Sequence, residues 1–239
     1  MTPAGLPLGA LAQVMEATWP CARAWQEGPW TIRDGAGGGK RVSAATADGP
    51  WTDADIPLAE AAMAAMGEPA LFLIRDGEAD LDAALAARGY RIVHPVVAYA
   101  CPAADLPPPP GMTTFAHWPP LAILRDLWAQ GGIGPARLAV MDRVTGPKAA
   151  ILVRQGDRPA GAAFVALSGT TAMLHALEIA PPRRRQGSAH HILQASAHWA
   201  LDHGADRLML VVTAANAPAR ALYASLGMQA VGHYHYRQR

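Results

Sequence analysis

Residues 113–239 are divided into short segments, and the spacing of apolar residues in each segment fits one helix or one strand. Gly- and Asp-containing turns at 155–158 and 168–170 separate the first three apolar runs. The pattern predicts helices at 120–130, 134–143, 187–203 and 217–226, and strands at 148–154, 159–167, 171–180, 207–213 and 229–237.

The connections between these segments predict how the strands pair. Short turns make the first three strands antiparallel, whereas the strands on either side of the 187–203 helix must be parallel and joined by a right-handed crossover. We therefore expect an α/β fold, in α+β style, with one mixed sheet and helices on both of its faces.

The first half contains a weak copy of the last part of the chain. Residues 71–89 align without gaps on 209–227 at a shift of 138 positions, and both segments have the pattern of a strand, a polar loop, a helix and a terminal glycine. Chance similarity is the alternative, because any strand–helix–strand unit has this shape; we favour a degenerate duplication. In the first copy Glu78 and Leu85 occupy the positions of Asn216 and Tyr223. Gly49 occupies that of Gly187, but the next helix begins only near residue 55.

Four consecutive prolines, 107–110, provide the clearest boundary in the sequence. A proline run cannot continue a helix or a central strand and tends to an extended conformation. We therefore predict a first domain at 1–106, a linker at 107–112 and a second domain at 113–239.

Composition restricts the class of protein. Apolar residues make up 51% of the 239 positions and charged residues 16%, which is enough for a hydrophobic core. A net charge of +1 argues against a nucleic-acid partner. The two distant cysteines, Cys21 and Cys101, have neither a disulfide-framework nor a metal-ligand spacing. No leader pattern or membrane-length apolar run is present, so we expect a cytoplasmic protein with no membrane partner.

Candidate chemistry is concentrated where the 171–180 strand leads into the next helix. The basic residues 183–185 precede Gly187, and the predicted helix begins there. The first N–H groups of a helix have no intrahelical partner and carry partial positive charge, so this segment is a candidate anion site. Small residues at Gly187 and Ala189 would let a phosphate approach the backbone. The alternative is a solvated basic loop before an ordinary helix cap.

The spacing Arg184-x-x-Gly187-x-Ala189, preceded by Leu177-x-Ile179-x-Pro181, resembles the acetyl-CoA signature of the GNAT superfamily. The later elements 204–205, Asn216 and 221–227 follow in the family's order and spacing, so the resemblance covers about residues 145–237. More loosely, the first half resembles the degenerate partner half of tandem GNAT proteins.

The resemblance implies a GNAT-like acyl-CoA transferase fold in the second half, with acetyl-CoA as cosubstrate and no metal. Backbone groups of Leu177, Glu178 and Ile179 would pair with the pantetheine arm, and Asn216 would bind nearby. The pyrophosphate would lie on the N–H groups from Arg185 to His190, with charge added by Arg184. The residues assigned to this cradle are Arg184, Arg185, Gln186, Gly187, Ser188, Ala189 and His190.

Transfer of an acetyl group to an amine needs a proton for the leaving sulfur and a neutral amine. Tyr223 is the predicted acid, because a phenol stays protonated at neutral pH; the alternative is a packed aromatic residue. In ribosomal-protein N-acetyltransferases of bacteria the base is a Glu where this chain has Val211. Glu178 is the nearest substitute, although pairing with an arginine explains it equally well, and deprotonation through water needs no dedicated base.

The sequence thus predicts an acetyl-CoA-dependent N-acetyltransferase acting on a primary amine, either a small molecule or a protein N-terminus, and allows a homodimer. A non-catalytic acyl-CoA-binding module and a structural partner subunit are the alternatives.

Three further patterns in the sequence each allow more than one interpretation. Residues 233–236 alternate between histidine and tyrosine, so in a strand the two histidines face one side and the two tyrosines the other. One pair could line the acceptor site; the alternative is that the strand only packs on a helix. The histidines of the 187–203 helix fit a solvated face better than a metal site. The glycine-rich segment 35–40 is interpreted as a hairpin turn, because Arg41 stands where a nucleotide-binding loop has Ser or Thr.

Overall fold

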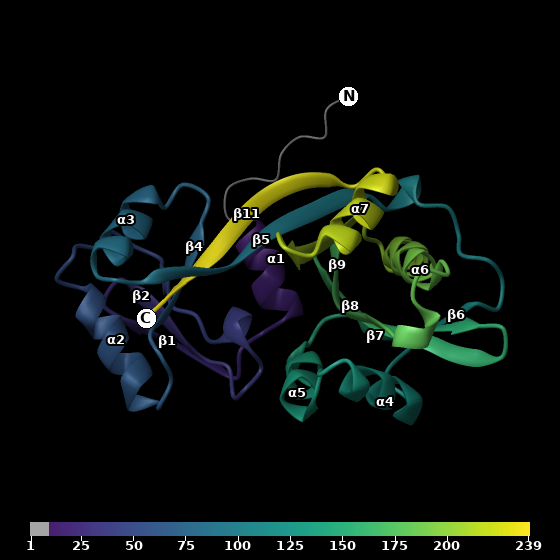
Figure 1. Cartoon of the computed structure of the whole chain (residues 1–239), viewed down its shortest axis with the longest axis horizontal. Helices are drawn as coiled ribbons and strands as arrows, with labels where there is room; N and C mark the ends of the chain where they lie inside the picture. The colour runs from purple at the N-terminus through teal and green to yellow at the C-terminus, as the bar shows by residue number, and fades with distance from the viewer. Residues whose placement is uncertain (1–9) are drawn as a thin grey trace.

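The computed structural model describes residues 10–239. An eight-stranded mixed sheet joins the two halves of the chain (Figure 1). From one edge to the other its strands are β4 (Leu71–Arg75), β11 (Gln229–Gln238), β5 (Arg91–Pro102), β10 (Arg207–Thr213), β9 (Thr171–Ile179), β8 (Arg158–Ser168), β7 (Lys148–Gln155) and β6 (Thr114–His117).

The helices and strands predicted for the second half are confirmed to within a few residues at their ends. The helices are α4 (Ala122–Gln130), α5 (Pro135–Arg143), α6 (Ser188–Asp202) and α7 (Ala217–Ser225). Strands β7, β8 and β9 are antiparallel, and β9 pairs with β10 in parallel, as the connection lengths required. Strand β6 was not predicted.

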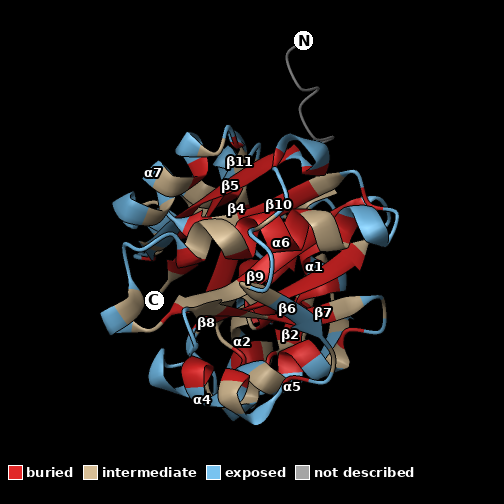
Figure 2. Ribbon diagram, turned by 90° about the vertical axis from the view of Figure 1, so that its right-hand side faces the viewer, coloured by how far each residue is buried: buried red, intermediate tan, exposed pale blue. Residues whose placement is uncertain are grey.

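Helices cover both faces of this part of the sheet. On one face Leu124 and Trp128 of α4 pack with Phe164 of β8. On the other face α6 packs through Ile192 and Leu193, and Figure 2 shows its buried residues lying across the strands. The mixed α/β sheet with helices on both faces is therefore confirmed.

The first half adds a small antiparallel sheet and three helices. The sheet contains β1 (Arg23–Glu27), β2 (Trp30–Asp34) and β3 (Thr46–Ala47), and the helices are α1 (Ala10–Thr18), α2 (Ile56–Ala65) and α3 (Ala79–Ala87). The glycine-rich segment 35–40 lies in the connection between β2 and β3, which pair antiparallel, so its interpretation as a hairpin turn is confirmed. Short 3-10 turns occur at Lys40–Val42, Ala103–Asp105 and Pro181–Arg183.

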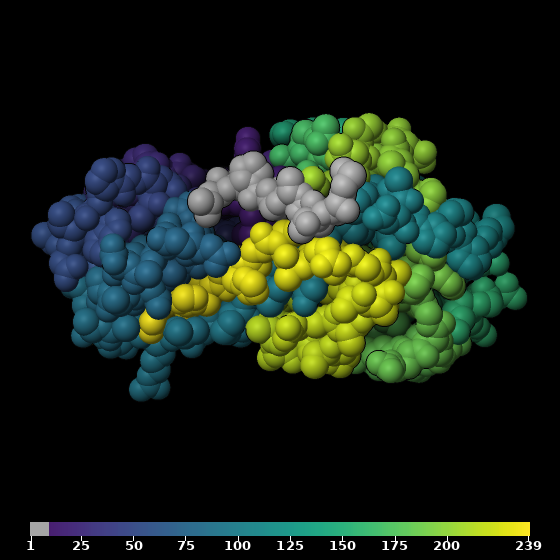
Figure 3. All heavy atoms as spheres, turned by 90° about the horizontal axis from the view of Figure 1, so that it is seen from above, coloured from purple at the N-terminus to yellow at the C-terminus, as the bar shows by residue number. Residues whose placement is uncertain are grey.

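The two halves exchange strands, which the sequence did not predict. Strand β5 of the first half lies between β10 and β11 of the second, with Val97 opposite both Val212 and His233. Strand β11 in turn lies between β5 and β4. In Figure 3 the yellow carboxy-terminal segment reaches among the blue residues of the first half. Residues 107–112, the predicted linker, form neither helix nor strand, and the sheet is continuous across the two predicted domains.

The exchange is nearly symmetric and supports a duplication. Helices α3 and α7 have the same length and begin 138 positions apart, as the sequence alignment requires. Asp82 of α3 accepts two hydrogen bonds from Arg237 of β11, at 2.7 and 2.9 Å. At the positions shifted by 138, Arg220 of α7 bonds the hydroxyl of Tyr99 on β5, at 3.3 Å. Each helix thus holds the strand that the other half contributes.

Candidate active site

The site begins where two parallel strands separate. Strand β10 pairs with β9 only over residues 207–210 and 171–174, and beyond these positions both strands continue without pairing to each other. The carboxyl ends of parallel strands are where α/β sheets bind ligands, because unpaired backbone groups and helix N-termini meet there. A cleft of about 540 Å³ occupies this opening.

A β-bulge in β9 lies in the wall of the cleft. His175 pairs with Phe164 and Glu178 with Ala162, so Ala176 and Leu177 together face a single residue of β8. Ala176 adopts φ +50, and its carbonyl accepts a hydrogen bond from the Trp128 indole at 2.8 Å. A bulge leaves backbone groups without ladder partners, and both bulge residues, Ala176 and Leu177, line the cleft. No glycine or proline marks this bulge in the sequence.

The predicted anion cradle has the backbone that such a site needs. Gly187 precedes α6 with φ +85, and the first hydrogen bond of the helix runs from His191 N to Gly187 O, at 3.1 Å. The N–H groups of Ser188, Ala189 and His190 come before that bond. A Cβ at Gly187 would meet only the His191 ring, at 3.9 Å, so there is room for a side chain. Glycine is favoured here because the backbone is left-handed.

The side chains around the cradle are partly engaged with one another. Arg184 donates to the Ile179 carbonyl and to Glu178 Oε1, both at 3.0 Å. Glu178 points toward Gly131 at the end of α4 and is not among the residues that line the cleft. Its carboxylate is therefore paired with an arginine, the alternative that the sequence left open. Arg185 is exposed, and the Gln186 amide bonds the Pro182 carbonyl.

Tyr223 and Asn216 come from α7 and both line the cleft. Tyr223 is 7% exposed, and burial raises the pKa of its phenol to about 12, with a smaller contribution from Tyr99. The two rings lie 5.6 Å apart, so the strand exchanged from the first half packs against the predicted acid. Asn216 caps α7 by accepting from Ala219 N at 3.2 Å. Leu177, in the bulge, lines the same cleft.

The first half supplies part of the cleft wall that sequence reasoning missed. Trp19, Lys40 and Arg41 line the cleft together with Tyr234 and Tyr236 of β11. Of the alternating residues 233–236, the tyrosines face the cleft, whereas His235 bonds Asp82 at 2.6 Å. Only the tertiary arrangement brings these residues to the opening of β9 and β10.

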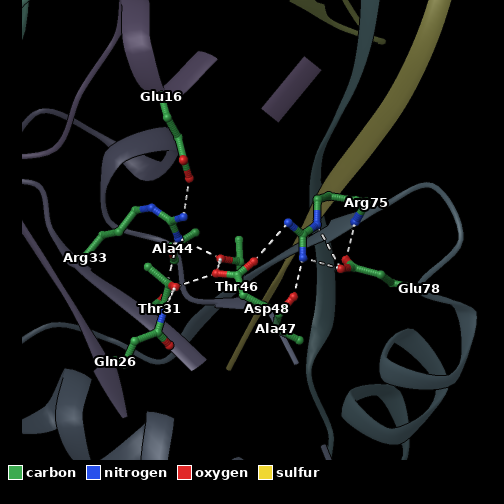
Figure 4. Close-up of polar contacts among 10 residues, drawn as sticks. All are labelled: Glu16, Gln26, Thr31, Arg33, Ala44, Thr46, Ala47, Asp48, Arg75 and Glu78. Atoms are coloured by element: carbon green, nitrogen blue, oxygen red, sulfur yellow. Dashed lines mark hydrogen bonds and ion pairs between the residues drawn. The ribbon is translucent and has the colours of Figure 1, made fainter. Parts of the chain in front are cut away.

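A second cleft of about 240 Å³ lies between the first half and residues 231–234 of β11. Figure 4 shows the polar network beside it, in which Arg33 bonds Glu16, Thr46 and the Ala44 carbonyl. Arg75 pairs with Glu78 at 2.6 Å and with Asp48 at 3.2 Å. Each arginine of this network therefore has a carboxylate partner within the protein.

Neither a metal-binding cluster nor a membrane-spanning helix is found within residues 10–239. No group of three or more His, Cys, Asp or Glu side chains is arranged to hold a metal ion in this part of the chain. Over the same residues, no helix is both long and apolar enough to cross a membrane.

Residues 121–228 match the model of the acetyltransferase (GNAT) family. This match identifies the GNAT acetyltransferase family in residues 121–228. Members of this family typically use acyl-CoA and acetylate amine acceptors. A comparison with curated proteins finds no match.

Solved structures share the fold over nearly the whole chain. A GCN5-related N-acetyltransferase from Kribbella flavida is similar with a TM-score of 0.74 at 18% identity, covering 98% of this chain and 96% of the other. A tandem GNAT protein from the clavulanic acid biosynthesis pathway is similar with a TM-score of 0.63 at 12% identity, covering 88% and 77%. Both likenesses include the first half, so the fold as a whole matches tandem GNAT proteins.

Proposed function

We propose that the protein transfers the acetyl group of acetyl-CoA to a primary amine. The observation that carries the proposal is the position of Tyr223, whose side chain lines the same cleft as the bulge in β9. The residues fit this cosubstrate, because a helix N-terminus beside basic residues suits a diphosphate and unpaired strand backbone suits the amides of the pantetheine arm.

Each residue then has a defined task. The N–H groups of Ser188, Ala189 and His190, with the charge of Arg185, bind the diphosphate, and the backbone of 177–179 aligns the pantetheine arm. Backbone N–H groups at the bulge are placed to stabilise negative charge that develops on the thioester oxygen.

Tyr223 provides the proton for the sulfur. As the amine nitrogen bonds to the carbonyl carbon and the carbon–sulfur bond breaks, the phenol donates to the departing thiolate, and the amine gives up one proton. A pKa of about 12 keeps the phenol protonated at every pH at which the amine reacts. Asn216 sets the start of α7 and hence the position of Tyr223.

Removal of the proton from the amine involves either Glu178 or water. Val211 lines the cleft at the position where some relatives carry a carboxylate. Glu178 is the carboxylate that we predicted for this role, and its ion pair with Arg184 gives it a competing one. The two roles predict different effects of Glu178→Gln: loss of a base lowers kcat, whereas loss of the ion pair lowers acetyl-CoA affinity.

The proposal is tested by incubating the protein with acetyl-CoA and a panel of primary amines while a thiol-reactive dye reports free CoA. Thiol release that depends on an amine supports transfer, and mass spectrometry of the acetylated product confirms it. Tight CoA binding with no release across the panel identifies a non-catalytic acyl-CoA-binding module. A structural partner subunit would show no thermal shift with CoA.

A further inference from the structure

We propose that the amine acceptor carries an anionic group, in the simplest case an amino-acid carboxylate, and that Arg41 binds it. This inference rests on the proposed function and adds the class of acceptor. It follows from the charges that line the cleft, from the way Arg41 is held, and from one of its nitrogen atoms that lacks a partner.

The cleft collects positive charge without a compensating acid. Lys40, Arg41 and Arg137 line it, and no aspartate or glutamate is among its lining residues. None of the three forms an ion pair within residues 10–239. Lys40 bonds a neutral group, the Gln238 amide oxygen at 2.5 Å. Uncompensated like charges in a cleft repel one another, and an anionic ligand removes that cost.

The smaller cleft shows that this is not a general property of the protein. Arg41 lines the smaller cleft as well, and the other two arginines there, Arg33 and Arg75, are each paired with a carboxylate, as Figure 4 shows. Arg33 and Arg75 are thus neutralised within the protein, whereas Lys40, Arg41 and Arg137, which line the cleft beside Tyr223, are left for a ligand.

Arg41 is held in place by a buried chain of hydrogen bonds. Its Nη1 lies 3.0 Å from His175 Nδ1, and because a guanidinium only donates, Nδ1 must accept. The Nε2–H of His175 then donates to Thr18 Oγ1 at 2.9 Å, and Thr18 donates to the Val14 carbonyl at 2.6 Å. Trp19 stacks on the His175 ring at 4.9 Å.

His175 is therefore a positioning residue and has no free nitrogen for catalysis. Burial, helped by the charge of Arg41, lowers its pKa well below the usual value. The ring stays neutral, so it accepts from Arg41 without adding a charge to the cleft.

One donor of Arg41 has no partner. Its Nε is buried and forms no hydrogen bond with the described protein atoms. The Nε edge of a guanidinium binds a carboxylate through two parallel hydrogen bonds. Because Nε has almost no accessible surface, a carboxylate reaches it only when the side chains around it shift; it would then satisfy the buried donor and offset the charge of the cleft.

This anion site differs from the cradle for the CoA diphosphate. Arg41 contacts His175, which precedes the bulge in β9, whereas the cradle follows the end of the strand at Ile179. The bulge lies between them, so one anion site is on each side of the expected thioester. The cations also lower the pKa of an incoming ammonium group, which favours the neutral, reactive amine without a dedicated base.

The test uses matched acceptors that differ only at the carboxylate, namely amino acids and their carboxamides. We expect higher kcat/KM for the amino acid of each pair, even though its amine has the higher pKa and is less often neutral. Arg41→Gln should reduce this preference at least about tenfold, mainly through KM, and Arg41→Lys should retain part of it. Arg154→Gln removes an exposed cation outside the cleft and should leave the preference intact.

Measurements of acetyl-CoA affinity and of thermal shift distinguish failure of this inference from failure of the acetyltransferase proposal. Acetyl-CoA affinity should not change in Arg41→Gln; if it falls instead, Arg41 binds the cosubstrate and the inference is wrong. Equal use of amino acids and amides also overturns the inference but leaves the acetyltransferase proposal standing. If no amine is acetylated, the acetyltransferase proposal fails, and the anion site is tested by thermal shift with N-acetyl amino acids and their amides. A larger shift with the acids that is lost in Arg41→Gln supports the anion site. Equal shifts with acids and amides refute it.

Discussion

The units β4–α3–β5 and β10–α7–β11 share one architecture but differ at the end of their first strand. In the first unit Arg75 and Glu78 form an ion pair there. At the corresponding positions of the second unit stand Thr213 and Asn216, which line the open cleft. Leu85, buried in the first unit, takes the place of Tyr223. At this point the first copy therefore carries an ion pair and a buried leucine, whereas the second carries neutral polar residues and a phenol that line the larger cleft.

The residues that precede helix α6 in the second copy and helix α2 in the first copy differ in charge. Before α6 the chain carries Arg184 and Arg185, and Gly187 adopts a left-handed conformation. Before α2 it carries Asp53 and Asp55, whose carboxylates disfavour a phosphate. We infer that the first copy cannot bind CoA in the manner proposed for the second, and the following experiments test that contrast.

The largest effect is expected from Tyr223→Phe. Loss of the proton donor should lower kcat by about 100-fold or more, with acetyl-CoA affinity retained. Because the phenol's pKa is about 12, the wild-type pH–rate profile should rise with amine deprotonation and show no fall below about pH 11. Steady-state kinetics from pH 6 to 11 measure both. Tyr90→Phe, whose hydroxyl bonds Glu60 in the first half, serves as control. An unchanged kcat in Tyr223→Phe would remove Tyr223 from catalysis.

Gly187→Glu should weaken acetyl-CoA binding by about 10- to 100-fold, since it strains a backbone at φ +85 and puts a carboxylate in the cradle. Isothermal calorimetry measures the affinity. The matched control is Gly49→Glu at the corresponding position of the first copy, where a Cβ meets nothing within 4 Å. If both substitutions weaken binding equally, the comparison between the copies breaks down.

Asp82→Asn tests the contact between the halves. It removes one side of the bidentate pair with Arg237 and should cost about 2 kcal/mol in the free energy of unfolding, roughly a thirtyfold change in the folding equilibrium. The bonds from Arg237 and His235 lower the pKa of Asp82 to about 2. Its stabilisation is therefore present above about pH 4 and is lost as the pH falls toward 2.

Urea unfolding at pH 7 and pH 3 measures both effects. Arg220→Gln, at the corresponding position of α7, should cost less, because it removes bonds only to neutral groups, the Tyr99 hydroxyl at 3.3 Å and the Ala214 carbonyl at 3.1 Å. Equal losses in the two variants would show that the two contacts are energetically equivalent.

The smallest effect is expected from Glu178→Gln. Since the carboxylate pairs with Arg184 and lies outside the cleft lining, we expect acetyl-CoA affinity to fall a few-fold with little change in kcat. A large loss of kcat with unchanged affinity would instead establish Glu178 as the base. Arg184→Gln should reproduce the affinity loss if the ion pair is responsible.

The sequence predicted the second half well because its apolar runs, turns and glycines are local signals. The strand exchange could not be predicted from local signals. The apolar residues of β5 and β11 would be buried equally well beside strands of their own half or of the other half. The bulge at Ala176 lacks a glycine, and His175 reads simply as one polar residue in a strand. Lys40 and Arg41 could not be placed because their contacts with the cleft span more than a hundred positions.

The reciprocal exchange of β5 and β11 makes this chain equivalent to a strand-swapped dimer whose subunits have been fused. Such a fusion frees the two copies to diverge, because a substitution in one is no longer repeated in its counterpart. In the function that we propose, the second copy binds the cosubstrate and the first forms part of the cleft wall, with Tyr99 packed on Tyr223 and Arg41 among the lining residues. Separate expression of residues 1–109 and 110–239 should therefore give fragments that recover a native sheet only when mixed.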